Sequence, residues 1–353
     1  MIRIILGILG ISLLIFVVVD LVWTTLFLGG GPLTRRLSNT LWQWMLRRHH
    51  DRPDYQLPAA AGLLIILLTI TVWMSLIWLG WTLVFHMSEG AVVASTSGAP
   101  AGFWARAYFT GFTLITLGVG DYRPIGAVWQ MATIVAAANG FFLVTLAITY
   151  LLPLIQAVVQ KRQVAAYISS LGQTPDDIIL NAWTGSGFGR LGDHLVTLAP
   201  RLMELGQSHL AYPVLHCFHS GERETAVAPS IAALDEALTM LRHGVDKKVR
   251  PDGSTLFPLR AAITKFLTTV GGVSNQEKMD APPPPSLNRL RAHGIPVLDD
   301  EEFVRDVDEQ TDRRRSLVAM VRSEGWSWEA LASVVPLEER PGTLPEPRQP
   351  LGG

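Results

Sequence analysis

Three long apolar runs dominate the first half of the chain. Residues 4–28 contain Asp20 as their only charged side chain, residues 59–85 contain none, and a third uncharged run lies between Arg123 and Lys161. Each run is as long as the roughly 20 apolar residues that a helix needs to cross a bilayer. The first run is too long for the core of a signal peptide and lacks a small-residue cleavage site, so we interpret it as an anchor. The pattern predicts three transmembrane helices.

The second half of the chain has a different pattern. Apolar positions recur at helical spacing in residues 176–183, 191–205, 231–241 and 259–270, and no run after Gln160 alternates as a strand would. A soluble helical region therefore follows the third span. The fold class that we expect is an all-α membrane protein.

The last part of the chain begins with a proline run. Ala281-Pro-Pro-Pro-Pro-Ser286 predicts a stiff linker of polyproline type. Asp299 or Asp300 can cap a charged helix that reaches about residue 322, and Ser327 can cap a short helix through Val335. Residues 336–353 contain proline and glycine but few apolar side chains, so we expect disorder there.

Composition supports a membrane protein and narrows its partners. Hydrophobic residues make up 49% of the 353 residues and charged residues only 17%, against about 25% in average soluble chains. A formal net charge of −1 argues against nucleic acid as a partner. Cys217 is the only cysteine, so no disulfide can form within the chain. The partner that the composition favours is membrane lipid.

Basic residues are distributed unevenly between the loops. Residues 29–58 carry five arginines, and Lys161 and Arg162 follow the third span, whereas Arg106 and Arg123 are the only basic residues between the second and third spans. Because short cytoplasmic loops are rich in Lys and Arg, we expect the N-terminus outside and the C-terminal half in the cytoplasm. The five arginines are Arg35, Arg36, Arg47, Arg48 and Arg52.

Between the second and third spans, residues 113–124 read Thr-Leu-Ile-Thr-Leu-Gly-Val-Gly-Asp-Tyr-Arg-Pro. The amphipathic stretch before them, residues 103–112, fits a re-entrant pore half-helix whose negative dipole end points to the membrane centre. Non-helical backbone at that depth is tolerated only when it is buried in protein or lines a water-filled cavity. Gly118 and Gly120 can adopt φ angles closed to other residues, so successive carbonyls can point one way and replace a cation's water shell.

Residues 116–121 resemble the selectivity filter of the potassium-channel pore family. The family filter reads Thr-Val-Gly-Tyr-Gly-Asp and this chain reads Thr-Leu-Gly-Val-Gly-Asp. The resemblance covers residues 59–160 as outer helix, pore helix, filter and inner helix. It implies a potassium-selective channel in which K+ is the permeant ion, no cofactor is needed, and four copies of the chain close the pore as a homotetramer.

The resemblance also implies roles for individual residues. The carbonyls that would bind K+ are those of Thr116, Leu117, Gly118 and Val119. The Thr116 hydroxyl would add a ligand, and Gly120 would complete the filter. Asp121 would anchor the back of the filter against Tyr108 of the pore helix, and Arg123 would ring the outer mouth.

The chain departs from the family pattern at two filter side chains. Val119 replaces the usual aromatic residue and Leu117 the usual valine. Because these side chains face away from the ions, the carbonyl ladder survives, but the aromatic cuff that braces it is lost. A weakly selective monovalent cation channel is therefore the alternative function within this class. The extra N-terminal span is a third departure, and its role stays open.

The third span contains two residues that can shape gating. Gly140 is placed like the family's gating-hinge glycine, and the alternative is close helix packing. Pro153 either bends the helix near Thr149 or lies where the helix approaches its end. Asn139, Thr145 and Thr149 either face a water-filled cavity or bond to neighbouring helices.

Three further patterns have ordinary structural explanations. Residues 187–192 fit G-x-G-x-x-G, but the segment before them is a poor strand, so a glycine-rich turn is favoured over a dinucleotide site. Asp20 is costly inside a span, and is either functional or reaches the cytoplasmic interface. The third pattern is a His and Cys cluster made of His209, His216, Cys217 and His219. Its spacing fits no standard zinc site, so core packing is favoured.

These patterns divide the chain into five parts. They are an extra helix and basic cytoplasmic loop (1–58), a pore domain (59–160), a cytoplasmic helical domain (161–280), a proline linker with C-terminal helices (281–335) and a disordered tail (336–353). We expect passive K+ conduction across the plasma membrane of a bacterium, not an enzyme, with an unidentified cytoplasmic regulator. The alternative from another class is a membrane-tethered ligand sensor acting through the cytoplasmic helices.

Overall fold

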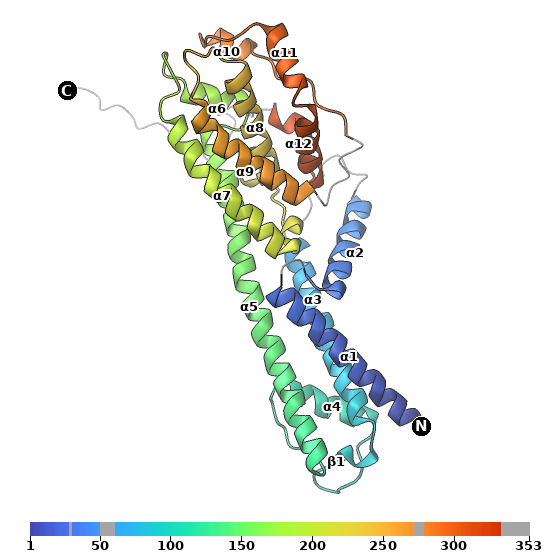
Figure 1. The fold of residues 1–353 in the computed structure, drawn as a ribbon. Coiled ribbons are helices and arrows are strands. Elements are labelled where there is room, and N and C mark those ends of the chain that lie inside the picture. Colours follow the sequence, from blue (N-terminus) through green and yellow to red (C-terminus); the bar gives the residue numbers. More distant parts are fainter. Residues whose placement is uncertain (28–29, 50–60, 272–278, 333–353) are drawn as a thin grey trace, which may run out of the picture. The chain divides into compact units, whose positions relative to one another are not determined.

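The computed structural model describes residues 1–27, 30–49, 61–271 and 279–332. The chain forms two compact units (Figure 1). Unit 1 consists of Met1–Lys161 and Glu204–Gly221, and unit 2 consists of Arg162–Met203 and Glu222–Gly353. The tail predicted at residues 336–353 lies outside the described residues.

Three helices have the length and composition to cross a membrane, which confirms the three predicted spans. They are α1 (Ile2–Leu26), α3 (Ala61–Phe85) and α5 (Ala127–Leu171). The helix α5 is 45 residues long and runs through Pro153 without interruption. The interpretation of Pro153 as a residue near the helix end is therefore wrong. The fold is all-α in character, as expected.

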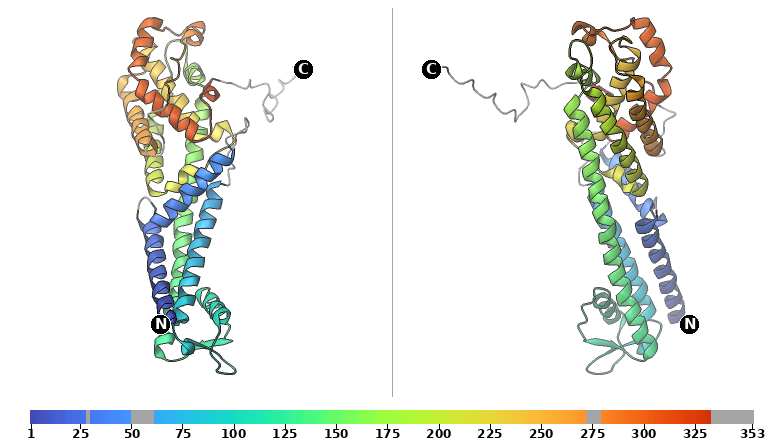
Figure 2. Two further views of the ribbon diagram at one scale, coloured as in Figure 1. Left: turned by 90° about the vertical axis from the view of Figure 1, so that its right-hand side faces the viewer. Right: turned by 60° about the vertical axis from the view of Figure 1, so that its left-hand side comes forward.

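The extra N-terminal span packs along α3. Figure 1 and the right-hand view of Figure 2 show α3 between α1 and α5. A Cβ placed on Gly10 would lie 2.6 Å from the Gly80 carbonyl oxygen, so the two backbones leave no room for a side chain. Small residues allow such close packing between membrane helices, where dispersion contacts hold helices together. The first span is thus a partner of the outer helix α3.

Between α3 and α5 the chain forms a short helix and two short strands. They are α4 (Phe103–Leu114), β1 (Val92–Ala94), which follows the turn η1 (Glu89–Ala91), and β2 (Tyr122–Pro124). The strands are antiparallel, with Ala94 opposite Tyr122. The half-helix was predicted, but three-residue strands are too short to show a periodic pattern in the sequence.

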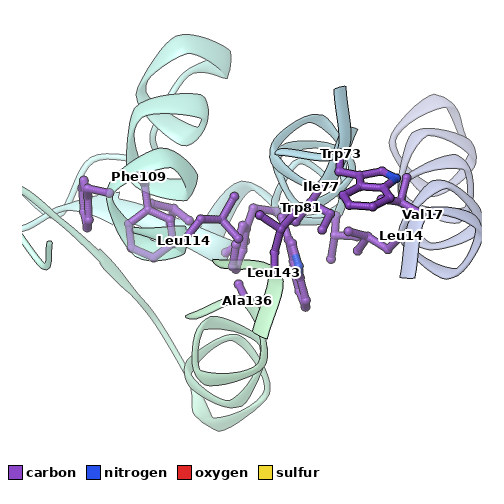
Figure 3. Close-up of a cluster of buried hydrophobic side chains, with 14 of the residues drawn as sticks. Leu14, Val17, Trp73, Ile77, Trp81, Phe109, Leu114, Ala136 and Leu143 are labelled. Atoms are coloured by element: carbon purple, nitrogen blue, oxygen red, sulfur yellow. The ribbon is translucent and has the colours of Figure 1, made fainter. Parts of the chain in front are cut away.

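A cluster of buried apolar side chains fixes α4 between the membrane helices (Figure 3). Trp73, Phe85, Phe109 and Leu143 are each at most 2% exposed. Phe85 of α3 and Phe109 of α4 meet edge to face, with ring centroids 5.2 Å apart, a preferred geometry for aromatic pairs. Residues 115–121, which follow α4, therefore begin at a helix that is held firmly by packing.

Residues 204–221 return to unit 1 through the end of α7 (Leu191–Ala211) and the short turn η2 (Pro213–Cys217). Lys161 donates through Nζ to the Phe218 carbonyl oxygen at 2.9 Å and is only 4% exposed. The Phe218 ring lies directly against Gly62 of α3, where it occupies the place of a side chain. This returning segment therefore joins α3 to α5.

Unit 2 is helical, as expected, and is built around α8 (Val227–His243). Every residue of α8 from Val227 to Leu241 is buried, which is typical of a helix enclosed on all sides. The other α-helices described in the unit are the last part of α5, α6 (Pro175–Ala182), the first part of α7, α9 (Gly253–Gly271), α10 (Asn288–Ala292), α11 (Asp300–Asp308) and α12 (Thr311–Ser323).

Two carboxylates of α8 are neutralised by arginines of α12. Arg314 donates to both oxygens of Glu236, at 2.8 and 3.0 Å, and the two side chains are 4% and 3% exposed. Arg313 donates to Asp235 at 2.8 Å. Buried charges are tolerated only when they are paired in this way, so these pairs fix α12 on α8.

The proline run lies in the same unit. Arg314 also donates to the carbonyls of Pro282 and Pro283, each at 2.8 Å. The proline run and α12 both belong to the predicted segment 281–335, and these bonds hold its two parts together. The predicted charged helix is two helices, α11 and α12, and the Asp299 carboxylate caps the first by accepting from the Glu301 N–H at 2.9 Å.

Candidate functional site

The filter segment, residues 116–121, follows α4 directly and has no regular secondary structure. The angle φ is positive at Thr116 (56°), Gly118 (61°) and Gly120 (89°), and not at Leu117 or Val119. Alternation between positive and non-positive φ turns successive peptide units relative to one another, so that their carbonyls can leave the chain on one side. This is the backbone geometry that a ladder of carbonyl ligands requires.

Thr116 is strained. Among the described residues it is the only non-glycine residue with a positive φ, and a β-branched residue there is a genuine outlier that costs about 1–3 kcal/mol. Two hydrogen bonds hold this conformation, since the Thr116 N–H donates to the Thr113 carbonyl at 3.0 Å and the Leu117 N–H to the Phe112 carbonyl at 2.8 Å. The last turn of α4 thus fixes the start of the filter segment.

Tyr108 and Asp121 lie together at the C-terminal end of the segment. The Tyr108 hydroxyl donates to Asp121 Oδ2 at 3.3 Å. The Tyr108 ring packs edge to face on Phe112 and Tyr122, with centroids 5.2 and 6.3 Å away. The structure therefore brings together the two residues that the resemblance paired.

Ser95, to which the sequence gave no role, contacts the same end. It is the residue after β1, its N–H donates to the Asp121 carbonyl at 2.9 Å, and its Oγ donates to the Gly120 carbonyl at 2.6 Å. The only sequence signal is a pair of valines, Val92 and Val93, followed by a Ser-Thr-Ser-Gly turn. That signal predicts a hairpin at most, and not its partner. Arg123, the predicted outer-mouth residue, is exposed in the middle of β2 opposite Val93.

The helix α5 passes directly beside the end of α4. Gly140 is buried, and a Cβ at this position would overlap the Leu114 carbonyl oxygen. Thr145 and Thr149 are exposed, and their hydroxyls donate at 2.9 Å to carbonyls one turn earlier in α5, not to neighbouring helices. A close contact at Gly140 is thus present, and the hinge role stays a prediction.

Asp20 is a fully buried carboxylate with three donors. It accepts from the Leu33 N–H at 2.7 Å, the Thr34 hydroxyl at 2.8 Å and the Trp73 indole N–H at 2.9 Å. Leu33 and Thr34 belong to the first turn of α2 (Pro32–His49), where a negative charge also favours the helix dipole. Asp20 therefore joins α1, α2 and α3 through its carboxylate.

Two sequence patterns remain, the His and Cys cluster around Cys217 and the glycine-rich residues 187–192. Burial raises the pKa of the Cys217 thiol to about 12, so little of this thiol is the nucleophilic thiolate at neutral pH. No group of three His, Cys, Asp or Glu side chains suited to a metal occurs in the part of the chain that the structure describes. Residues 187–192 connect α6 to α7, so a helix stands where a dinucleotide site needs a strand.

The three spans, the half-helix and the filter segment define a membrane ion channel. In agreement, residues 62–157 match the family model described as "Ion channel" (Ion_trans_2). The chain belongs to the same family as the "Uncharacterized membrane protein YdjJ" of Bacillus subtilis (strain 168). The two are 34% identical over 321 residues, which cover 90% of this chain and 94% of YdjJ. No solved structure matches the chain.

Proposed function

We propose that this protein is the subunit of a potassium-selective channel that conducts K+ passively across the plasma membrane. The observation that carries the proposal is the alternation of φ between Thr116 and Gly120, directly after a half-helix. K+ would bind the carbonyls of Thr116, Leu117, Gly118 and Val119 and the Thr116 hydroxyl, which together replace its water shell. The negative dipole end of α4 favours a cation near this point.

A homotetramer is part of the proposal, because one filter segment cannot surround an ion. In the single chain Leu117 is 64% and Val119 44% exposed. Non-helical backbone at membrane depth must be covered by protein, and further copies of the chain would cover it. Exposed apolar side chains of α5, such as Phe141 and Ile148, offer the surface for this contact.

The proposed orientation rests on charge. The arginine-rich residues 29–58 and the pair Lys161 and Arg162 favour a cytoplasmic location for these segments. The N-terminus and the filter's outer end would then face outward, and unit 2 would lie in the cytoplasm, where it can receive a regulator. No catalytic step or cofactor is part of this function.

A weakly selective cation channel is the second candidate, favoured by one observation. Val119 supplies no aromatic ring behind the carbonyls, and a poorly filled space there forfeits packing contacts that would hold the ladder's shape. We therefore expect a K+ preference that Val119→Tyr raises or leaves unchanged.

The test is the full-length protein in liposomes under bi-ionic K+ and Na+ conditions. Gly118→Ala should abolish conduction or selectivity, because φ is +61° and nothing lies within 4 Å of the added Cβ, so that the loss comes from the backbone angle. Gly294→Ala is the matched control, since Gly294 also has a positive φ (74°) and open space but lies in unit 2, just after α10.

Each outcome separates the candidates. A reversal potential that favours K+ supports the proposal, and equal K+ and Na+ permeability supports the weakly selective channel. A folded oligomer that passes no ions but binds a small molecule through unit 2 would replace both candidates with a membrane-tethered sensor.

A further inference from the structure

We propose that Ser95 is a positioning residue that fixes the outer end of the filter segment and keeps the Gly120 carbonyl out of the ion ladder. This inference rests on the proposed function of residues 116–119 as K+ ligands. It concerns a residue outside the filter motif, on a strand that precedes α4.

The geometry at Ser95 engages two consecutive carbonyls. Its hydroxyl donates to the Gly120 oxygen at 2.6 Å and its N–H to the Asp121 oxygen at 2.9 Å. Both distances lie within the normal range for such bonds. Because the Gly120 carbonyl accepts from the Ser95 hydroxyl, it is engaged by the protein and is not offered to an ion. The ladder therefore ends at Val119.

The backbone position of Ser95 is set by the two-stranded sheet of β1 and β2 and by the turn that follows β1. Ala94, the residue before it, pairs with Tyr122 of β2 on one side, and its N–H donates to the Ala99 carbonyl at 2.9 Å on the other. The Gly98 N–H closes the turn by donating to the Ala94 carbonyl at 2.9 Å. The strand pairing and the turn thus fix the backbone of Ala94, and with it the position of Ser95 beside the filter segment.

The other brace at this end is weaker. The Tyr108 hydroxyl lies 3.3 Å from Asp121 Oδ2, beyond the usual 2.5–3.0 Å for an O–H···O bond. Val119 offers no polar group or ring to the protein behind it. The two bonds from Ser95 are therefore the shortest links between the outer filter and the rest of the chain in the described residues, and they act where the aromatic cuff is lost.

A variant can remove the hydroxyl without removing the strand. Ser95→Ala keeps the N–H bond to Asp121 but frees the Gly120 carbonyl. Without the Ser95 hydroxyl, the Gly120 carbonyl needs another hydrogen-bond donor or a cation, so it turns toward water or toward the ions. Either movement changes the outermost ion site while the Thr116 to Val119 carbonyls stay available.

The experiment uses the full-length protein in liposomes, with three variants. Ser95→Ala should keep conduction and shift the K+/Na+ permeability ratio roughly fivefold, the factor that one net hydrogen bond is worth. Ser95→Thr, which keeps the hydroxyl, should retain the native ratio. Thr96→Ala removes a hydroxyl from the exposed neighbouring position and should have no effect.

Hydrogen–deuterium exchange of peptides covering residues 115–124 gives a second measurement that does not depend on selectivity. Ser95→Ala should speed exchange there, and Thr96→Ala should not. Native permeability and native exchange in Ser95→Ala would overturn the inference. If the native protein does not prefer K+ at all, the proposed function fails, and exchange in the Ser95 variants still decides whether Ser95 holds the filter segment.

Discussion

Gly140 of α5 lies directly against the backbone carbonyl of Leu114, the last residue of α4, with no room for a side chain between them. Leu114 is followed within two residues by Thr116, where the strained filter segment begins. A side chain added to α5 at this point would therefore press on the end of α4, two residues before Thr116. In the close-packing interpretation of Gly140, the residue against which it packs is therefore Leu114.

Gly140→Ala tests this contact. Because the added Cβ would overlap a backbone carbonyl, α4 or α5 must shift, and overpacking of this kind costs about 1–3 kcal/mol. We expect a lower midpoint of thermal unfolding in detergent together with a lower open probability in single-channel recordings. Gly111→Ala is the control, since its Cβ would meet Trp78 at an ordinary 3.5 Å. Lower open probability with unchanged stability would instead favour a pure hinge.

Asp20→Asn should destabilise the junction of the first three helices. The carboxylate accepts three hydrogen bonds, whereas an amide offers one acceptor oxygen and brings two donors of its own. Each buried donor left without a partner costs about 1–3 kcal/mol. Thermal unfolding of the detergent-solubilised protein measures this loss. Ser12→Ala, on the same helix, should have little effect because the exposed Ser12 hydroxyl donates to the Ile8 carbonyl within α1.

Cysteine labelling can establish the orientation. Cys217 is buried and its pKa is raised to about 12, so the reactive thiolate is scarce at pH 7.5 and becomes abundant only near that pKa. We expect the native protein to resist a membrane-impermeant maleimide until it is denatured. On this background, Thr96→Cys should label from outside and Asn39→Cys only from inside, as both side chains are exposed. The reverse pattern would contradict the proposed orientation.

The buried pair of Arg314 and Glu236 should dominate the stability of α12. Arg314→Met leaves a carboxylate buried without its partner, which typically costs about 3–5 kcal/mol. The double variant Arg314→Met, Glu236→Met should cost less than the sum of the single changes, and denaturant unfolding measures the difference. Arg315→Met is the matched control, because its pair with Asp312 is exposed and worth at most about 1 kcal/mol. Additive single effects would show that the two side chains do not interact.

The sequence alone predicts the features that depend on residues adjacent in the sequence. Hydropathy locates the three spans because the bilayer requires a continuous apolar run. The filter segment is recognisable because its six residues are contiguous, and its glycines at 118 and 120 are where φ is positive. The positive φ of Thr116 follows from no local preference of threonine.

Features that join distant residues are not accessible in this way. Ser95 and Gly120 are 25 positions apart and Arg314 and Glu236 are 78 apart, and nothing in either segment specifies its partner. Asp20 is conspicuous as a charge within a span, yet Trp73, 53 residues away, gives no sign that its indole is the donor. These pairings depend on how helices and strands meet, which short-range periodicity does not encode.

The return of residues 204–221 to unit 1 has a consequence for how the protein is made. Translation produces the three membrane helices first, but the site beside Gly62 stays empty until Phe218 has left the ribosome. At about 5–20 residues per second, that delay lasts several seconds after the end of the membrane span. The contact between Phe218 and Gly62 therefore cannot form while the membrane helices are being inserted, and a chain that stops after α5 would lack it.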